Sequence, residues 1–165
     1  MSQVIAKHNF KVAKQNEPQQ AQPACNCRGG TARCPVDGAC QSQEVVYQAK
    51  VTRLDNNKQE FYTGLTARPF KVRYYEHRSD FNNQEREGTC LSNYIWELKK
   101  KNVPYRITWK ILVRSRSFNP STKACNLCLK EKYFIMFRPE GATLNCRNEF
   151  FATCRHRLKP LLANS

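Results

Sequence analysis

Nine cysteines in a chain of 165 residues constrain the fold of this protein more than any other feature of its sequence. Four of them, Cys25, Cys27, Cys34 and Cys40, lie in a segment that is punctuated by glycine and offers almost nothing to an apolar core. Zinc binding to thiolates can supply the free energy that orders such a segment. We therefore predict a zinc knuckle over residues 25–43, with a thiol-rich loop or a disulfide pair as the alternative.

A second set of metal ligands is found near the carboxyl end of the chain. Cys125 and Cys128 form a Cys-x-x-Cys pair at the expected start of a helix, and Cys154 and His156 follow further on. Such a pair spans two corners of tetrahedral zinc, whose usual ligands are thiolate sulfur and imidazole nitrogen. These four residues predict a structural zinc site, with His8 as the substitute if Cys154 or His156 does not bind. The alternative is that Cys128 belongs to the core and Cys154 is incidental.

The remaining cysteines and the amino end of the chain bear on the cellular compartment. Cys90 and Cys146 have no evident partner and are interpreted as structural residues. The odd number of cysteines argues against a closed disulfide framework. The start of the chain is polar and charged, without the apolar stretch of a secretory signal peptide. We therefore expect an intracellular, reducing location, where clustered thiols bind metal more often than they pair.

The charge of the chain indicates its partner. There are 28 Lys and Arg against 13 Asp and Glu, a formal net charge of +15, while 40% hydrophobic residues are enough for a folded domain. No apolar stretch approaches the roughly 18 residues of a membrane span, so we expect no integral membrane protein. A surface this positive attracts a phosphate backbone, and Arg28 and Arg33 of the knuckle are candidate contacts. A nucleic acid is the expected partner; a merely soluble basic protein is the alternative.

The periodicity of residue types predicts an α+β fold after a polar segment or linker at 1–24, which contains a short helix at 2–14. Apolar alternation predicts strands at 45–51, 60–65 and 107–113, the first two forming a hairpin around a turn at 54–58. Helices are predicted at 69–78, 89–101, 119–137 and 148–161, with Thr89 or Ser92 as a cap and Phe70, Val72 and Tyr74 as packing residues. The expected architecture is a small three-stranded antiparallel sheet flanked by helices, over residues 44–163.

Two tyrosine tripeptides lie on the predicted hairpin. They are Val45-Val46-Tyr47 and Tyr62-Thr63-Gly64, and beyond them Arg73 and His77 are one helical turn apart. This combination resembles the GIY-YIG nuclease family, although Val45 replaces the glycine and Thr63 the isoleucine of the family tripeptides. In the same order along the chain, Glu131 looks like the metal-binding glutamate of that family and Asn145 looks like its asparagine.

The resemblance is closer to one branch of that family, the endonuclease domain of Penelope-like retroelements. It covers about residues 1–163, nearly the whole chain. The segments that carry it include the cysteine-rich stretch, Ile5–Asn9, Phe70–Arg73, Leu91–Lys99, Cys125–Cys128 and Cys154–His156. It implies a DNA endonuclease in the nucleus, fused to or acting with a reverse transcriptase and in contact with the RNA of the element. A repair nuclease that selects DNA structures, and a catalytically inactive zinc-binding nucleic-acid module, are the alternatives.

The resemblance also implies a role for each residue of the site. Glu131 holds a single Mg²⁺ or Mn²⁺, and Tyr47 is the general base, although an unperturbed phenol has a pKa of about 10. Arg73 binds the phosphate, Tyr62 and His77 orient water and phosphate, and Asn145 steadies the loop beside the metal. Four of these residues also have an ordinary interpretation: strand tyrosines pack, and His77 and Arg73 can face solvent. Glu131 is more suggestive, because a carboxylate on an otherwise apolar and basic helix needs a reason. Glu97 is the rival metal ligand.

Overall fold

The computed structural model describes residues 24–86, 88–115, 125–146 and Cys154. The predictions made for residues 1–23, for the helices at 2–14 and 148–161, and for His8 and His156 therefore lie outside the described residues. Within them the protein is α+β, with one three-stranded antiparallel sheet and three α-helices. Among the described residues, no helix is both long and apolar enough to cross a membrane.

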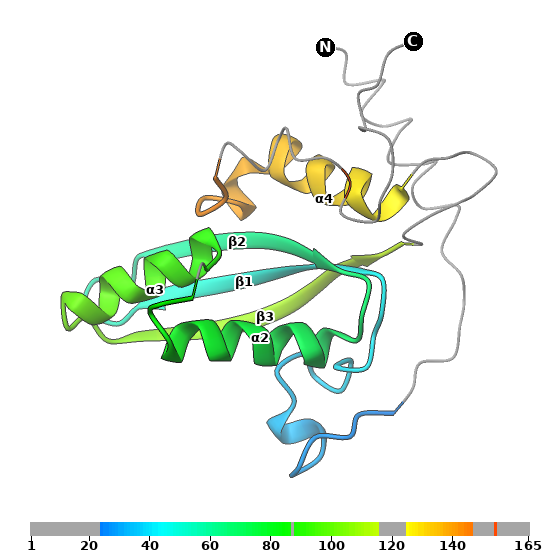
Figure 1. Ribbon diagram of the computed structural model, residues 1–165, viewed down its shortest axis with the longest axis horizontal. Coiled ribbons are helices and arrows are strands. Elements are labelled where there is room, and N and C mark those ends of the chain that lie inside the picture. The colour runs from blue at the N-terminus through cyan, green and yellow to red at the C-terminus, as the bar shows by residue number, and fades with distance from the viewer. Residues whose placement is uncertain (1–23, 87, 116–124, 147–153, 155–165) are drawn as a thin grey trace.

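The sheet has β1 at its centre. Strand β1 (Val45–Arg53) pairs antiparallel with β2 (Gln59–Thr66) on one side and with β3 (Tyr105–Arg114) on the other, which gives the order β2-β1-β3 (Figure 1). Tyr47 faces Gly64 on β2 and Ile111 on β3. The predicted hairpin and the predicted third strand are both confirmed, since each follows from a local alternation of apolar and polar residues.

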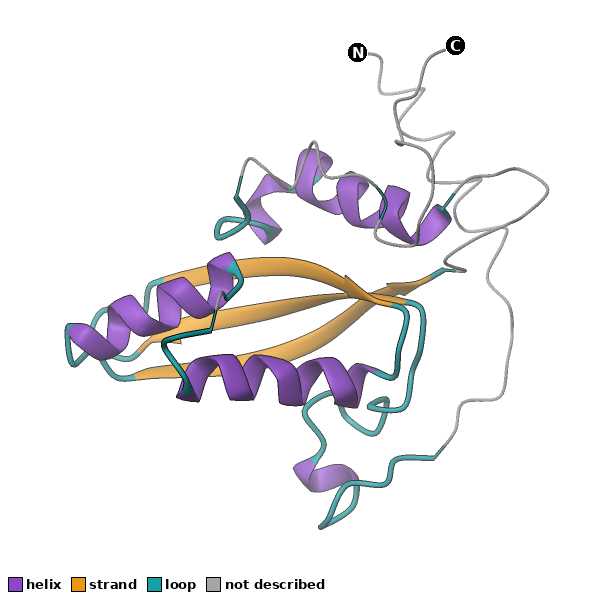
Figure 2. Cartoon of the chain, in the orientation of Figure 1, coloured by secondary structure: helices purple, strands orange, loops and turns teal. Residues whose placement is uncertain are grey.

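The three helices pack on the two faces of this sheet (Figure 2). Helices α2 (Phe70–Asn82) and α3 (Cys90–Lys100) share one hydrophobic cluster with the odd-numbered residues of β1: Val45, Tyr47, Ala49 and Val51 pack with Phe70, Phe81, Leu91 and Ile95. Helix α4 (Asn126–Phe137) belongs to a second cluster, in which Leu127 and Cys128 pack against Val46 and Leu65. Because successive strand side chains point to opposite faces, α4 lies across the sheet from α2 and α3.

The helix boundaries differ in part from the predicted ones. The Thr89 side chain accepts a hydrogen bond from the Ser92 N–H at 3.3 Å and so caps α3, as one of the two predicted caps. Helix α2 runs on to Asn82, and Val72 lies on its outer face with 38% of its surface exposed, so the prediction that Val72 packs in the core is wrong. Helix α4 begins only at Asn126, since Cys125 has an extended backbone; a continuous helix through Cys125 is therefore wrong.

Two short 3-10 helices and one disulfide complete the described chain. η1 (Thr31–Arg33) lies in the cysteine-rich segment and η2 (Pro139–Gly141) follows α4. Cys90 at the start of α3 is disulfide-bonded to Cys146, with their Cα atoms 6.3 Å apart. These two cysteines, for which the sequence shows no evident partner, are therefore partners of each other. Because they are 56 positions apart in the sequence, only the tertiary fold brings them together.

Candidate functional site

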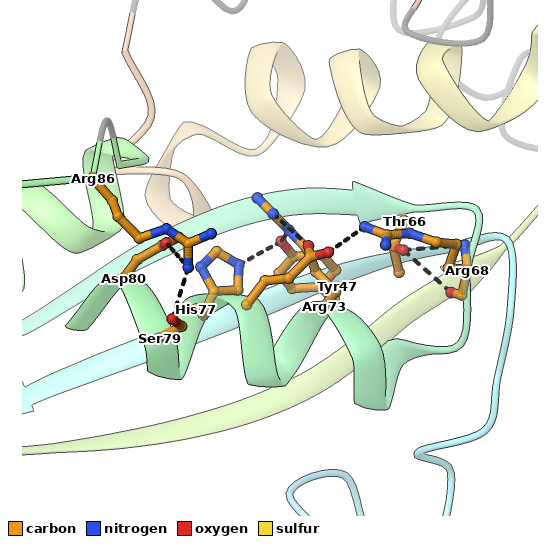
Figure 3. A network of polar contacts seen from close by, with 9 residues as sticks. Tyr47, Thr66, Arg68, Arg73, His77, Ser79, Asp80 and Arg86 are labelled. Atoms are coloured by element: carbon orange, nitrogen blue, oxygen red, sulfur yellow. Dashed lines mark hydrogen bonds and ion pairs between the residues drawn. The ribbon is translucent and has the colours of Figure 1, made fainter. Parts of the chain in front are cut away.

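A buried polar cluster joins β1 to α2. The Tyr47 hydroxyl lies 2.8 Å from Nε2 of His77 and accepts a hydrogen bond from Nε of Arg73 at 3.1 Å (Figure 3). Arg73 and His77 are one turn apart on α2, so both reach the same strand residue. Tyr47 and His77 are fully buried, whereas the Arg73 side chain keeps 18% of its surface exposed. The guanidinium is therefore the member of the cluster that reaches solvent.

The absence of a side chain at Gly64 leaves room for the Tyr47 ring. A Cβ atom built on Gly64 would lie 2.6 Å from the Tyr47 hydroxyl oxygen and 2.8 Å from Cζ of the same ring, closer than real Cβ contacts allow. Gly64 is the direct partner of Tyr47 on β2, within the strand rather than at its end. The phenol of Tyr47 thus extends from the central strand across to the edge strand, and its hydroxyl lies above the backbone of β2. Only a residue without a side chain permits that position.

His77 is enclosed by aromatic rings. Its ring stacks on Phe81 at 6.0 Å and lies 5.3 Å from Trp109, with Tyr62 edge-on at 6.0 Å. Burial in this setting, together with the nearby charge of Arg73, lowers the pKa of His77 to about 3. The imidazole is therefore neutral at physiological pH.

The neutral imidazole can serve Tyr47 in either of two ways. With its proton on Nδ1, His77 accepts the hydroxyl hydrogen of Tyr47; with its proton on Nε2, it donates to the phenol oxygen. The buried Nδ1 has no hydrogen-bond partner among the described residues. In the second form, Arg73 and His77 both donate to Tyr47, which is the arrangement that stabilises a phenolate.

Glu76 anchors the arginine of this cluster. Its carboxylate accepts from Nη1 of Arg73 at 3.0 Å and also pairs with Arg68 in the β2–α2 connection. Partial burial alone would raise the pKa of Glu76, but the hydrogen bonds from Arg73 and Arg68 hold it below its ordinary value. Burial alone would lower the pKa of Arg73, but Tyr47 and Glu76 hold it above its ordinary value. Arg73 is thus a fixed, fully charged group beside the phenol.

The edge of β2 is occupied by the segment that contains Asn145. The Asn145 side chain accepts from the Thr63 N–H at 2.9 Å and donates to the Thr63 C=O at 2.8 Å. The Leu144 N–H donates to the Phe61 C=O at 2.8 Å, so two consecutive residues bind the strand. Asn145 is therefore held one residue from Gly64, along the edge toward which the Tyr47 hydroxyl extends.

The six residues with predicted catalytic roles lie in three places. Tyr47, Tyr62, Arg73 and His77 converge between the sheet and α2. Glu131 is a buried residue of α4, with 8% of its surface exposed, and so belongs to the layer on the other face of the sheet. Asn145 is bound to the edge of β2. Glu97, the rival ligand, is an exposed residue of α3.

The four cysteines of the amino-terminal segment, Cys25, Cys27, Cys34 and Cys40, form one cluster, with every sulfur within 4.8 Å of the others. The Cys40 sulfur lies 3.6 Å from that of Cys25 and 3.7 Å from that of Cys27. Tetrahedral zinc with bonds of about 2.3 Å places its sulfur ligands about 3.8 Å apart. The Cys27 N–H donates to the Cys25 sulfur at 3.4 Å and lowers the pKa of that thiol. This cluster can hold a metal ion and is consistent with zinc.

Three further cysteines meet beside α4. The sulfur atoms of Cys125, Cys128 and Cys154 lie within 4.8 Å of one another, and all three residues are buried. Cys128 and Cys154 have their sulfurs 3.4 Å apart, and Cys125 caps α4 by accepting the Cys128 N–H at 3.4 Å. Burial raises the pKa of the Cys128 thiol. This group too can hold a metal ion, and Cys154 belongs to it as predicted, while the predicted ligand His156 lies outside the described residues.

Sequence reasoning missed Glu76 and Trp109. Glu76 lies three residues after Arg73 on a predicted helix, a spacing that favours an ion pair and could have identified it. Trp109 lies on a predicted strand, but nothing local indicates that its ring contacts His77. Comparison of the chain with protein-family models, with characterised proteins and with solved structures gave no match.

Proposed function

We propose that the protein is a metal-dependent DNA endonuclease of the GIY-YIG type. The observation that carries the proposal is the Tyr47 hydroxyl, which is held by Arg73 and His77 and extends over Gly64 to the edge strand. A phenol with two such donors is suited to act as a base, since both stabilise its deprotonated form. The net charge of +15 favours a nucleic-acid substrate.

In this proposal the chain's own groups divide the work of phosphodiester hydrolysis. The Tyr47 phenolate takes a proton from water as the water oxygen bonds to phosphorus and the bond to the leaving sugar oxygen breaks. Arg73 binds a nonbridging phosphate oxygen, and Glu76 keeps its guanidinium in place. Glu131, although it lies in the opposite layer, would provide the carboxylate for a Mg²⁺ or Mn²⁺ at the β2 edge toward which Tyr47 extends, and the ion would stabilise charge on the phosphate and the leaving oxygen. In a retroelement, the new 3′ end would prime the reverse transcriptase.

Both cysteine groups are proposed to hold zinc. The first is a Cys₄ site built from residues 25–40, and the second uses Cys125, Cys128 and Cys154 with one further ligand. The second site lies at the start of the helix that bears Glu131, so it would fix the position of this carboxylate. Zinc content measured on the purified chain tests this part, with about two ions per chain expected.

A second candidate is a nucleic-acid-binding module without catalysis. It is favoured by the complete burial of Tyr47 and His77. A general base must contact the attacking water, which would require the cluster to open when DNA binds. In the alternative, the same cluster serves only to hold α2 on the sheet.

The experiment that separates the two functions is a plasmid relaxation assay at low salt with Mg²⁺ or Mn²⁺. We expect metal-dependent nicking that is lost in Glu131→Gln and in Tyr47→Phe, and that falls by about 10²- to 10³-fold in Arg73→Ala. Asn145→Ala should have a smaller effect. Glu97→Gln is the matched control, because this exposed carboxylate should be dispensable. Supercoiled plasmid that is shifted in a gel but never cut would favour the binding module.

A further inference from the structure

A cavity separates the cysteine-rich segment from the outer side of α2. It has a volume of about 510 Å³, within the range of about 300–1,000 Å³ that is typical of ligand sites. The α2 residues that line it are Lys71, Tyr74, Tyr75 and Arg78, which share one helix face because they lie three, four and seven positions from the first. This face is distinct from the one that carries Arg73 and His77.

The opposite wall of the cavity comes from the cysteine-rich segment. Arg28 and Arg33 lie on that side, together with Asn26, Cys27 and Pro35. The two walls are firmly joined: the N–H groups of Phe70 and Lys71 donate to the carbonyls of Ser42 and Cys40, at 2.9 and 2.8 Å. The same segment (blue in Figure 1) lies beside the first turns of α2. The shape of the cavity is thus fixed by main-chain hydrogen bonds between its two walls.

The charge in this cavity has one sign. Arg28, Arg33, Lys71 and Arg78 are basic, and none of the described residues that line the cavity is acidic. Among the described residues, none of these four cations forms an ion pair. The ammonium of Lys71 is oriented by neutral acceptors only, the carbonyl and side-chain oxygens of Asn26 at 3.1 and 2.7 Å. Four uncompensated cations around one cavity are a site for phosphate.

Two tyrosine rings lie among these cations. Tyr75 is 52% exposed, and its ring lies 5.6 Å from that of Tyr74, over which the Arg78 guanidinium is placed at 5.9 Å. An exposed ring next to phosphate-binding cations is the arrangement on which an unstacked base can stack. In a duplex the bases are stacked on one another, so only its phosphates could use such a site.

We propose that this cavity binds one nucleotide of a single-stranded nucleic acid, with its phosphate on the basic side chains and its base on Tyr75. The inference deepens the proposed function and rests on it: it names an unpaired strand, next to the duplex that is cut, as the second substrate element of the nuclease. Stacking on tyrosine does not depend on the sugar, so both DNA and RNA strands meet the requirement.

The test measures binding of the full, zinc-loaded chain to dye-labelled oligo(dU), oligo(U) and a DNA duplex by fluorescence anisotropy. No Mg²⁺ or Mn²⁺ is added, so nothing is cut. In Tyr75→Ala we expect the Kd for single strands to rise by about 5- to 100-fold, with the duplex Kd changed by less than about twofold. Tyr75→Phe, which keeps the ring, should bind like the parent. Phe137→Ala, which removes a half-exposed ring from α4, is the matched control.

Salt dependence tests the phosphate half of the proposal. Arg78→Ala should weaken single-strand binding and reduce the slope of log K against log salt by about 0.7, whereas the exposed Lys100→Ala should leave both unchanged. Oligo(dU) and oligo(U) differ only in the sugar, so the tighter of these two identifies the preferred strand. Equal losses on single strands and duplex, or no loss in Tyr75→Ala, would overturn the proposal. Since nicking by the parent is scored separately, the pocket and the nuclease can each fail alone.

Discussion

The cysteine-rich segment and the sheet–α2 cluster are neighbours in this molecule, but they are held together differently. In the segment from Cys25 to Cys40, the buried side chains are Cys34, Val36 and Cys40. A cluster of four cysteine sulfurs therefore takes the place of an apolar core. Between the sheet and α2, the rings of Tyr47, Phe70, His77 and Trp109 fill the interior and leave room for only a few polar atoms. The cysteine-rich segment should therefore need a bound ligand to stay folded, whereas the sheet–α2 cluster should be held by side-chain packing.

The difference matters because the first region fixes part of the second. The carbonyls of Cys40 and Ser42 accept the N–H groups that open α2, a helix whose N-cap residue Pro69 offers no side-chain hydrogen bond. Metal binding at one end of the molecule can therefore influence the start of the helix that carries Arg73. The following experiments test how far the two regions are independent.

Metal removal should have the largest effect. A zinc chelator should remove the hydrogen-exchange protection of the Gly30, Cys34, Ala39 and Ser42 amides, which bond within the cysteine-rich segment. Structural zinc contributes about 10–16 kcal/mol of apparent binding energy in small metal-nucleated units. Amides of the β1–β2 ladder should keep their protection. Cys34→Ser should reproduce the loss without a chelator, and a segment that stays protected in both tests would contradict a metal-held fold.

Acid should act on the packed cluster through His77. Its pKa is lowered to about 3 by burial and by Arg73, so the unfolded chain binds one more proton than the folded chain between that value and about 6.5. The stability that neutral His77 contributes is thus complete above about pH 6.5 and is lost as the pH falls toward 3.

We expect the free energy of unfolding, measured with urea, to fall as the pH is lowered from about 6 to 4. It should fall by about 1.4 kcal/mol per pH unit more in the parent than in His77→Gln. Acid release of metal from the cysteines occurs in both proteins and cancels in the difference. Parallel pH profiles would show that His77 titrates normally.

Gly64→Ala should destabilise the sheet alone. Its new Cβ would contact the Tyr47 hydroxyl and ring, which have no room to move among the surrounding aromatics. Overpacking of this kind costs about 1–3 kcal/mol, measured by chemical denaturation, and zinc content should not change. Gly141→Ala is the matched control: its Cβ would meet only the end of the Gln48 side chain. Equal costs at the two glycines would refute a special requirement at Gly64.

Lys71→Met should have the smallest effect on stability. It tests the contact between the cysteine-rich segment and α2. It removes two hydrogen bonds to Asn26 while the main-chain bonds of the same helix turn remain. Because these bonds lie at the surface, we expect a loss below about 1 kcal/mol, seen as faster exchange in the cysteine-rich segment only. A global loss of stability would show that the two regions unfold as one unit.

Local patterns in the sequence were sufficient to predict the sheet but not the surroundings of the site. The hairpin and the third strand follow from alternation, and the shared helix face of Arg73 and His77 follows from their spacing. The same reasoning failed for Val72, because the buried face of α2 carries Arg73 and His77 while an apolar residue points outward. Where polar groups occupy the inner face, apolarity does not mark burial.

The remaining features depend on contacts between distant parts of the chain. The Cys90–Cys146 bond and the binding of Asn145 to Thr63 join residues 56 and 82 positions apart. No period or spacing in the sequence encodes such meetings. The four-cysteine cluster was predictable because its ligands lie within one short segment, whereas the predicted roles of Tyr47, Glu131 and Asn145 stay predictions until cleavage is measured.

The binding of the Asn145 segment to β2 has a consequence for how copies of this protein meet one another. Edge strands with free N–H and C=O groups invite pairing between molecules, the route to fibres and precipitates. Here the β2 edge is covered by residues of the same chain, and β3 is the other border of the sheet in the part of the chain that the structure describes. Arg106 and Lys110 lie exposed along that border. Two molecules that approach each other through this border would bring like charges together. Edge-to-edge pairing is therefore opposed at β2 by the protein's own chain and at β3 by charge repulsion.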